Sequence, residues 1–204
     1  MSATAVTAFA EPLRRIPKFV LFGAAALVQL ALLAVMVADR VEILREGTEV
    51  KLQIQPVDPR DLFRGDYVTL SYDISRLPAG ALKDQRAGGR NPIVYVVLAP
   101  NQDGIYQAVS LHTDAVAVQS PEVLIRGRVV SGTYCGPTHD RFCDSLNIRY
   151  GLESYFVPEG EGRTIERDRN QHKLMVVAAV APSGRAAIKR LLVDGVAAYE
   201  EALF

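Results

Sequence analysis

The chain has 204 residues, with 23 Lys and Arg against 23 Asp and Glu, so its formal net charge is zero. This balance argues against a nucleic-acid-binding protein, which needs a basic surface to neutralise phosphates. The length allows one membrane anchor and one compact domain.

Residues 19–38 are apolar except for Gln29. A helix of this length spans the roughly 30 Å hydrocarbon core of a bilayer. The alternative is a cleaved signal peptide, whose apolar region has about 7–15 residues and ends in a small-x-small site. This run is longer and has the bulky Met36 near its end, so we expect an uncleaved anchor.

Basic residues flank the run almost equally, with Arg14, Arg15 and Lys18 before it and Arg40, Arg45 and Lys51 after it, but the nearer cluster is the one before it. Because basic flanks stay in the cytoplasm, we expect a single-pass protein of the cytoplasmic (inner) membrane with its N-terminus inside. The expected layout is a cytoplasmic tail (1–18), a transmembrane helix (19–38), a juxtamembrane helix extension (39–47) and an extracytoplasmic, periplasmic β-rich domain (48–204).

The domain is rich in short segments with strand character, separated by Gly, Pro, Asn or Asp. Val50, Leu52 and Ile54 alternate with polar residues, which is typical of a half-buried strand. Many strands without alternating helices predict a mainly β fold, an antiparallel sandwich or barrel-like domain with little helix. We expect further strands, a hairpin loop at residues 182–185 and a short helix at 195–204; the strands are 67–72, 93–99, 104–111, 123–130, 148–151 leading into 155–157, 174–181 and 186–193.

The two cysteines, Cys135 and Cys143, are separated by seven residues. In an oxidising compartment this spacing favours a disulfide that closes a short loop. Free thiols remain an alternative, and so does metal binding with His139, although two Cys and one His fall short of a four-ligand site. His112 and His172 have no metal-ligand spacing, and we expect no metal or other cofactor.

The most distinctive segment contains Gly65-Asp66-Tyr67-Val68-Thr69-Leu70-Ser71-Tyr72. This segment resembles the GDYXXLXY family of membrane-anchored proteins, whose biochemistry is not established. A second segment is similar to the same family and begins Tyr150-Gly151-Leu152-Glu153-Ser154-Tyr155-Phe156-Val157-Pro158. Family members often occur beside polytopic membrane proteins, so the resemblance implies a membrane partner but no reaction.

Three interpretations of the first segment stay open. Gly65 suits a tight turn into a strand and Asp66 can accept backbone amides there, which makes a structural corner. Alternatively, a recognition surface for the partner includes Arg60, Arg64, Gly65, Asp66, Tyr67 and Tyr72. A catalytic Asp66 is the least favoured interpretation.

The second segment also has alternatives. Tyr155 and Phe156 fit a strand in the core, and a surface for a partner would add Tyr150, Gly151, Glu153 and Pro158. A cation site built from carboxylates is a further option, because Ca²⁺ prefers several carboxylate oxygens; it would use Glu153, Glu159, Glu161 and Glu166.

Signal peptidase I also combines one membrane span with a β-rich outer domain. In this chain, however, Pro56 stands where that enzyme's nucleophile would be, and proline has no hydroxyl. We therefore expect no enzyme activity, but an accessory or scaffold subunit of a bacterial envelope complex that docks a polytopic membrane protein. The alternatives are a degenerate peptidase and a ligand-binding sensor with a pocket lined by Tyr67, Tyr95 or Tyr106.

Overall fold

A computed structural model describes residues 17–55, 67–83, 92–135, 141–156 and 174–200. The chain divides into two compact units, residues 1–41 and residues 42–204. Helix α1 (Lys18–Glu46) begins in the first unit and contains the whole apolar run of residues 19–38. Within the described residues it is the one helix long and apolar enough to cross a membrane, as an anchor or a signal sequence. Its most apolar 18-residue window has a mean hydropathy of 2.5, and none of that window is buried.

The last turn of α1 belongs to the second unit. Ile43 and Leu44 are buried there and form a small cluster with Ala179 and Ala187. Strand β1 (Thr48–Gln55) begins directly after Gly47, whose amide donates to the carbonyl of Ile43 at 2.9 Å. A Cβ on Gly47 would lie 2.5 Å from that carbonyl oxygen, so the tight passage from helix to strand requires glycine.

The first sheet has five antiparallel strands in the order β12-β11-β10-β1-β3. They are β3 (Ser71–Tyr72), β10 (Leu174–Val180), β11 (Ala186–Val193), β12 (Val196–Glu200) and β1. Val50, Leu52 and Ile54 of β1 are all buried, which confirms the alternation read from the sequence. The hairpin expected at residues 182–185 joins β10 to β11.

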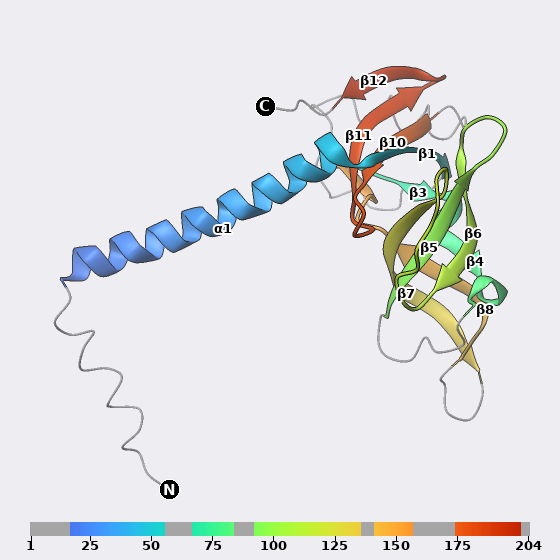
Figure 1. The fold of residues 1–204 in the computed structure, drawn as a ribbon, viewed down its shortest axis with the longest axis horizontal. Coiled ribbons are helices and arrows are strands. Elements are labelled where there is room, and N and C mark those ends of the chain that lie inside the picture. The colour runs from blue at the N-terminus through green and yellow to red at the C-terminus, as the bar shows by residue number, and fades with distance from the viewer. Residues whose placement is uncertain (1–16, 56–66, 84–91, 136–140, 157–173, 201–204) are drawn as a thin grey trace, which may run out of the picture. The chain divides into compact units, whose positions relative to one another are not determined.

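The second sheet curves into a nearly closed barrel (Figure 1). Its order is β4-β8-β7-β5-β6, with β4 (Arg76–Pro78), β5 (Ile93–Pro100), β6 (Tyr106–His112), β7 (Val123–Cys135) and β8 (Arg141–Arg149). After β4, the 3-10 helix η3 (Ala79–Ala81) leads the chain to the opposite edge. There Leu82 bridges to Leu111, and the amide of Lys83 donates to the carbonyl of Leu111 at 2.9 Å.

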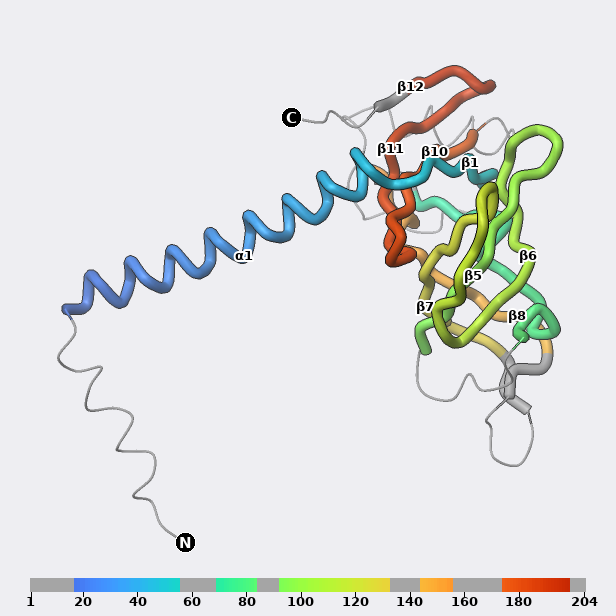
Figure 2. Tube along the Cα trace, viewed as in Figure 1, coloured from blue at the N-terminus to red at the C-terminus, as the bar shows by residue number. Residues whose placement is uncertain are grey.

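Both sheets contribute to one core. Buried side chains of β1 and β10 lie in the same cluster as those of the barrel strands, and Figure 2 follows the chain through both sheets. The core includes two tyrosines, Tyr72 and Tyr150, alongside aliphatic residues. The expected fold, one apolar helix followed by antiparallel β-sheet in a barrel-like arrangement, is confirmed.

Three local expectations were wrong. Residues 196–200 form β12 and not a helix, because Asp194 (φ 48°) and Gly195 (φ 81°) make a two-residue turn that sends the chain back along β11. Residues 67–72 form two strands in different sheets, β2 (Tyr67–Thr69) and β3. The strand expected at 148–151 is the end of the longer β8, which pairs with β7 up to Cys135.

Candidate functional site

A short two-stranded ladder brings the two distinctive sequence segments together. Strand β2 pairs antiparallel with β9 (Ser154–Phe156), so that Tyr67 lies opposite Phe156 and Thr69 opposite Ser154. Just beyond the ladder, the amide of Leu70 donates to the carbonyl of Glu153 at 2.8 Å. Residues more than 80 positions apart in the chain therefore form one structural junction.

Two buried tyrosines lock this junction reciprocally. The hydroxyl of Tyr72 donates to the carbonyl of Leu152, and the hydroxyl of Tyr150 donates to the carbonyl of Ile74, both at 2.6 Å. Each tyrosine thus bonds the backbone two residues beyond the other tyrosine. We name Tyr72 and Tyr150 the tyrosine clasp. Because both rings lie in the core, the clasp joins burial of apolar surface to satisfaction of two backbone carbonyls.

Burial raises the pKa of both clasp tyrosines well above the usual range, and the negative charge of Glu153 raises each pKa further. Both hydroxyls therefore stay protonated at neutral pH and act as hydrogen-bond donors. A group held neutral in this way is suited to holding backbone in place, not to exchanging protons with a substrate.

Glu153 has a structural task of its own in the second segment. Its carboxylate accepts the amide of Tyr150 at 2.6 Å and the amide of Gly151 at 3.0 Å. Gly151 has a φ of 80°, a conformation that favours glycine. The carboxylate thus closes the turn that carries the chain from Tyr150 to β9. Glu159, Glu161 and Glu166, the other members of the considered cation site, lie outside the described residues.

Gly127 on β7 makes room for the second clasp tyrosine. A Cβ on Gly127 would lie 2.4 Å from Cγ2 of Ile148 and 3.0 Å from Cε1 of Tyr150. The aromatic ring therefore packs directly against bare backbone. The sequence gives no local signal for this contact, because the two residues are distant along the chain.

The structure tests only part of the predicted recognition surface. Tyr72 is not at a surface: it is 2 % exposed and its hydroxyl is used within the clasp. Tyr67 and Phe156 are placed through their backbones in the ladder, and Tyr155 is half-buried on β9. The other members lie outside the described residues: Arg60, Arg64, Gly65, Asp66 and Pro158. For those residues, the recognition surface stays a prediction.

A cleft of about 300 Å³ lies between the last turn of α1 and the β10–β11 turn. On one side are Glu42, Glu46 and their neighbours, and on the other Ser183 and Arg185, whose Nε donates to Oγ of Ser183 at 3.4 Å. Tyr95 and Tyr106, which were considered for a ligand pocket, do not line this cleft.

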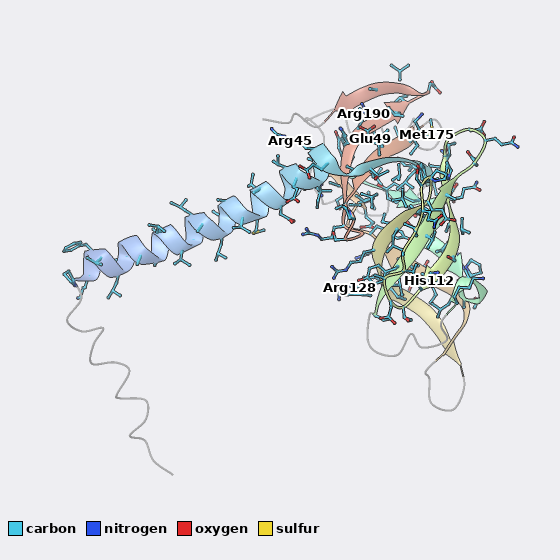
Figure 3. The ribbon with its side chains drawn as sticks, viewed as in Figure 1. Arg45, Glu49, His112, Arg128, Met175 and Arg190 are labelled. Atoms are coloured by element: carbon cyan, nitrogen blue, oxygen red, sulfur yellow. The ribbon has the colours of Figure 1, made fainter. Side chains whose placement is uncertain are left out.

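Two polar groupings had no sequence signal. Glu49 on β1 pairs with Lys189 at 2.8 Å and with Arg190, and Figure 3 shows Glu49 beside Arg190. The hydrogen bond from Lys189, partly offset by burial, lowers the pKa of the Glu49 carboxyl. On β6, Ser110 Oγ and His112 Nε2 lie 2.9 Å apart. In the parts of the chain that the structure describes, no group of three or more His, Cys, Asp or Glu is placed to hold a metal ion.

These features define a class of protein with one apolar helix followed by an antiparallel β-domain, in which the tyrosine clasp joins the two distinctive segments. The family model for GDYXXLXY protein matches residues 29–191, so the chain belongs to the GDYXXLXY family. No curated protein and no solved structure matches the chain. The motif's Leu70 and second tyrosine, Tyr72, are core residues in this fold.

Proposed function

We propose that this protein is a single-span membrane protein that serves as a non-enzymatic accessory subunit for a polytopic membrane partner. In this proposal residues 1–18 lie in the cytoplasm, α1 anchors the chain in the cytoplasmic membrane, and the β-domain lies outside, in the bacterial envelope. The observation that carries it is the surface of α1: the helix is apolar on every side and its apolar window is fully exposed. Such a surface is stable only in lipid or against other apolar helices.

The continuity of α1 supports an anchor over a cleaved signal. The helix runs from the apolar residues through Met36-Val37-Ala38 to Glu46 without interruption. Signal peptides end in a small-x-small cleavage site, and here that stretch is helical and contains a methionine. Ile43 and Leu44, one turn further, are already part of the folded domain.

One face of the helix is suited to another helix. Gln29 has Ala25 and Ala26 four and three residues before it, so all three side chains lie on the same side. Small residues let helix backbones approach closely in lipid, and a glutamine amide there gains from a hydrogen bond to the neighbouring helix. We assign the docking contact in the membrane to this face.

Copurification tests the proposal by placing the same Ala→Leu substitution on two opposite faces of α1. The tagged full chain is extracted from native membranes in mild detergent, as wild type, Ala25→Leu and Ala31→Leu. Ala25 lies near Gln29 around the helix and Ala31 on the opposite side, so only Ala25→Leu should block close approach. We expect one polytopic protein to copurify with the wild type and with Ala31→Leu, and to be lost with Ala25→Leu and with Gln29→Leu. A chain that elutes alone in every variant would contradict the proposal.

A second copurification series addresses the outer surface. Asp66→Ala and Tyr67→Ala should weaken recovery of the same partner if the first segment also docks it. Unchanged recovery with both variants would confine docking to the membrane helix.

The compartment has its own test at the two cysteines. An oxidising location predicts a disulfide between Cys135 and Cys143. The register places Arg141 directly opposite Cys135, so the bond would join diagonal positions of the β7–β8 hairpin. Mass spectrometry of unreduced peptides from native membranes should show the linked pair. Two free thiols, together with protease protection of the domain in spheroplasts, would point to a cytoplasmic domain.

A further inference from the structure

Three arginines gather on the outer side of the barrel. On β7 the residues that point inward, Ile125, Gly127 and Val129, alternate with Arg126 and Arg128, and Figure 3 shows Arg128 on the outer side of this strand. Arg149 of β8 lies directly opposite Arg128 in the register. We name Arg126, Arg128 and Arg149 the arginine face.

The arginine face has no anionic counterpart among the described residues. The ion pairs in the described parts of the chain join Glu49 to Lys189 and Arg190, which lie outside the arginine face. In those parts the side chains of Arg126, Arg128 and Arg149 make no hydrogen bond or ion pair. Like charges directly opposite each other destabilise a sheet. An arrangement that is unfavourable within the protein becomes favourable when an external anion lies between the guanidinium groups. Guanidinium binds phosphate through paired hydrogen bonds, as it does carboxylate.

The neighbours of these arginines are apolar or amphipathic. In the register between β7 and β5, Ile93 lies opposite Arg128 and Tyr95 opposite Arg126, on the same outer side. Ile93 is 36 % exposed and Tyr95 half-buried. Basic groups beside an exposed aliphatic chain and a tyrosine are typical of protein surfaces at the level of lipid headgroups. A site for free phosphate or for an acidic peptide has no need of the exposed isoleucine.

A backbone contact connects the arginine face to the β10–β11 turn. The amide of Arg126 donates to the carbonyl of Gly184 at 2.7 Å, in the β10–β11 turn. That turn lines the same cleft as Glu42.

We propose that the arginine face binds the phosphate of anionic phospholipid headgroups. The inference rests on the proposed function in one respect, the membrane anchor, which tethers the domain to the bilayer. Arg126 and Arg128 would hold the phosphate of one lipid, with Arg149 adding the third guanidinium across the strand pair. Tyr95 and Ile93 would contact the glycerol and the first methylenes.

Lipid titration of the full chain tests this assignment. The chain in neutral detergent is titrated with dioctanoylphosphatidylglycerol or dioctanoylphosphatidylcholine, and bound lipid is counted by native mass spectrometry. The test variant combines Arg126→Gln, Arg128→Gln and Arg149→Gln. The matched control removes the same charge elsewhere, with Lys51→Gln, Arg76→Gln and Lys83→Gln. We expect the phosphatidylglycerol affinity to fall about fivefold for each arginine removed, or roughly a hundredfold in the test variant, and to change less than twofold in the control.

Other outcomes would overturn the proposal. Equal losses in the test and control variants would show a nonspecific charge effect, and equal affinity for phosphatidylcholine would show that the lipid charge is irrelevant. Displacement of the lipid by equimolar inorganic phosphate would identify a free-phosphate site. Loss of a copurified protein with lipid affinity intact would identify an acidic protein surface as the ligand. Circular dichroism of the test variant shows whether it is folded.

The membrane anchor and the lipid binding of the arginine face are tested by separate experiments. Intact mass and membrane fractionation of the natural protein report whether residues 19–38 remain in the membrane. The titration in detergent depends on neither the partner nor the bilayer. A cleaved or soluble chain would therefore contradict the proposed function even if the lipid affinity followed the arginines.

Discussion

The inner and outer sides of β7 and β8 contrast sharply, although they alternate along the same strands. On the inner side, Gly127 and Ile148 pack against the ring of Tyr150, and the tyrosine's hydroxyl has a backbone acceptor. On the outer side, Arg128 faces Arg149 with no described counter-charge. Among the described residues, the inner side is apolar with its tyrosine hydroxyl hydrogen-bonded, whereas the outer side holds two like charges opposite each other.

This difference separates structural from functional assignments. Leu70 and Tyr72, two positions of the family's motif, are fully accounted for by burial and by hydrogen bonds to the second segment. Their presence in the motif therefore reflects how the domain is built. Substitutions on the inner side should change stability, and substitutions on the outer side should change binding while stability stays nearly constant. The predictions below test this separation, and all use the full chain in neutral detergent.

The largest effect is expected for Tyr150→Ala. This change leaves a cavity in the core and removes the donor to the carbonyl of Ile74. We expect the free energy of unfolding to fall by about 3–5 kcal/mol, as measured by urea unfolding followed by circular dichroism. Tyr95→Ala, the same truncation on the outer side of the barrel, should lose about 1 kcal/mol or less. Similar losses for the two variants would show that the clasp does not hold the core.

Gly127→Ala should produce the next largest effect. The added methyl would overlap Cγ2 of Ile148 and press on the ring of Tyr150, so we expect about 1–3 kcal/mol of destabilisation. Gly80→Ala is the matched control, because nothing lies within 4 Å of the position of its Cβ. If Gly127→Ala and Gly80→Ala unfold at the same urea concentration, the added methyl group does not press on the Tyr150 ring, and the packing described here is wrong.

Removing only the clasp hydroxyl gives a smaller loss with a distinct pH dependence. Tyr150→Phe leaves the carbonyl of Ile74 without its donor, so about 1–3 kcal/mol should be lost at neutral pH. In the wild type the native pKa of Tyr150 is raised, so its contribution is complete below about pH 10 and decreases above it, where the unfolded chain loses the proton first.

The difference between wild type and Tyr150→Phe should therefore narrow above pH 10, by about 1.4 kcal/mol per pH unit. Urea unfolding at pH 8, 10 and 11 measures it. A difference that stays constant through pH 11 would mean that the Tyr150 hydroxyl ionises as readily in the folded protein as in the unfolded chain.

The sequence predicts the elements of this fold better than their connections. Alternation in Val50-Lys51-Leu52-Gln53-Ile54 identifies β1 because a strand with one buried face must repeat every two residues. The first half of β8 contains Arg141, Asp144 and Ser145, so its sequence does not predict a strand, and only pairing with β7 makes it one. The Asp194-Gly195 pair is itself a hairpin signal, which outweighs the helix expected after it.

The contacts of the junction between the two segments could not be predicted from the sequence, for a different reason. Alternation shows that Tyr72 has a buried side, but the acceptor of its hydroxyl is Leu152, 80 residues later. Which carbonyl meets which hydroxyl depends on the register of non-local strand pairs, and no local pattern encodes that register. The arginine face was hidden likewise, because Arg128 and Arg149 become neighbours only through the pairing of β7 with β8.

The smallest expected effect has the opposite sign. Arg149→Gln removes one of two like charges that lie directly opposite on the outer side, so the folded protein should gain about 0.2–1 kcal/mol at low salt. The gain should vanish near 1 M salt, where the Debye length is about 3 Å. The same variant should bind phosphatidylglycerol about fivefold more weakly. A charge that weakens the fold while strengthening lipid binding is retained for the ligand, whereas a stability loss in Arg149→Gln would show that this arginine serves the fold, as the inner side does.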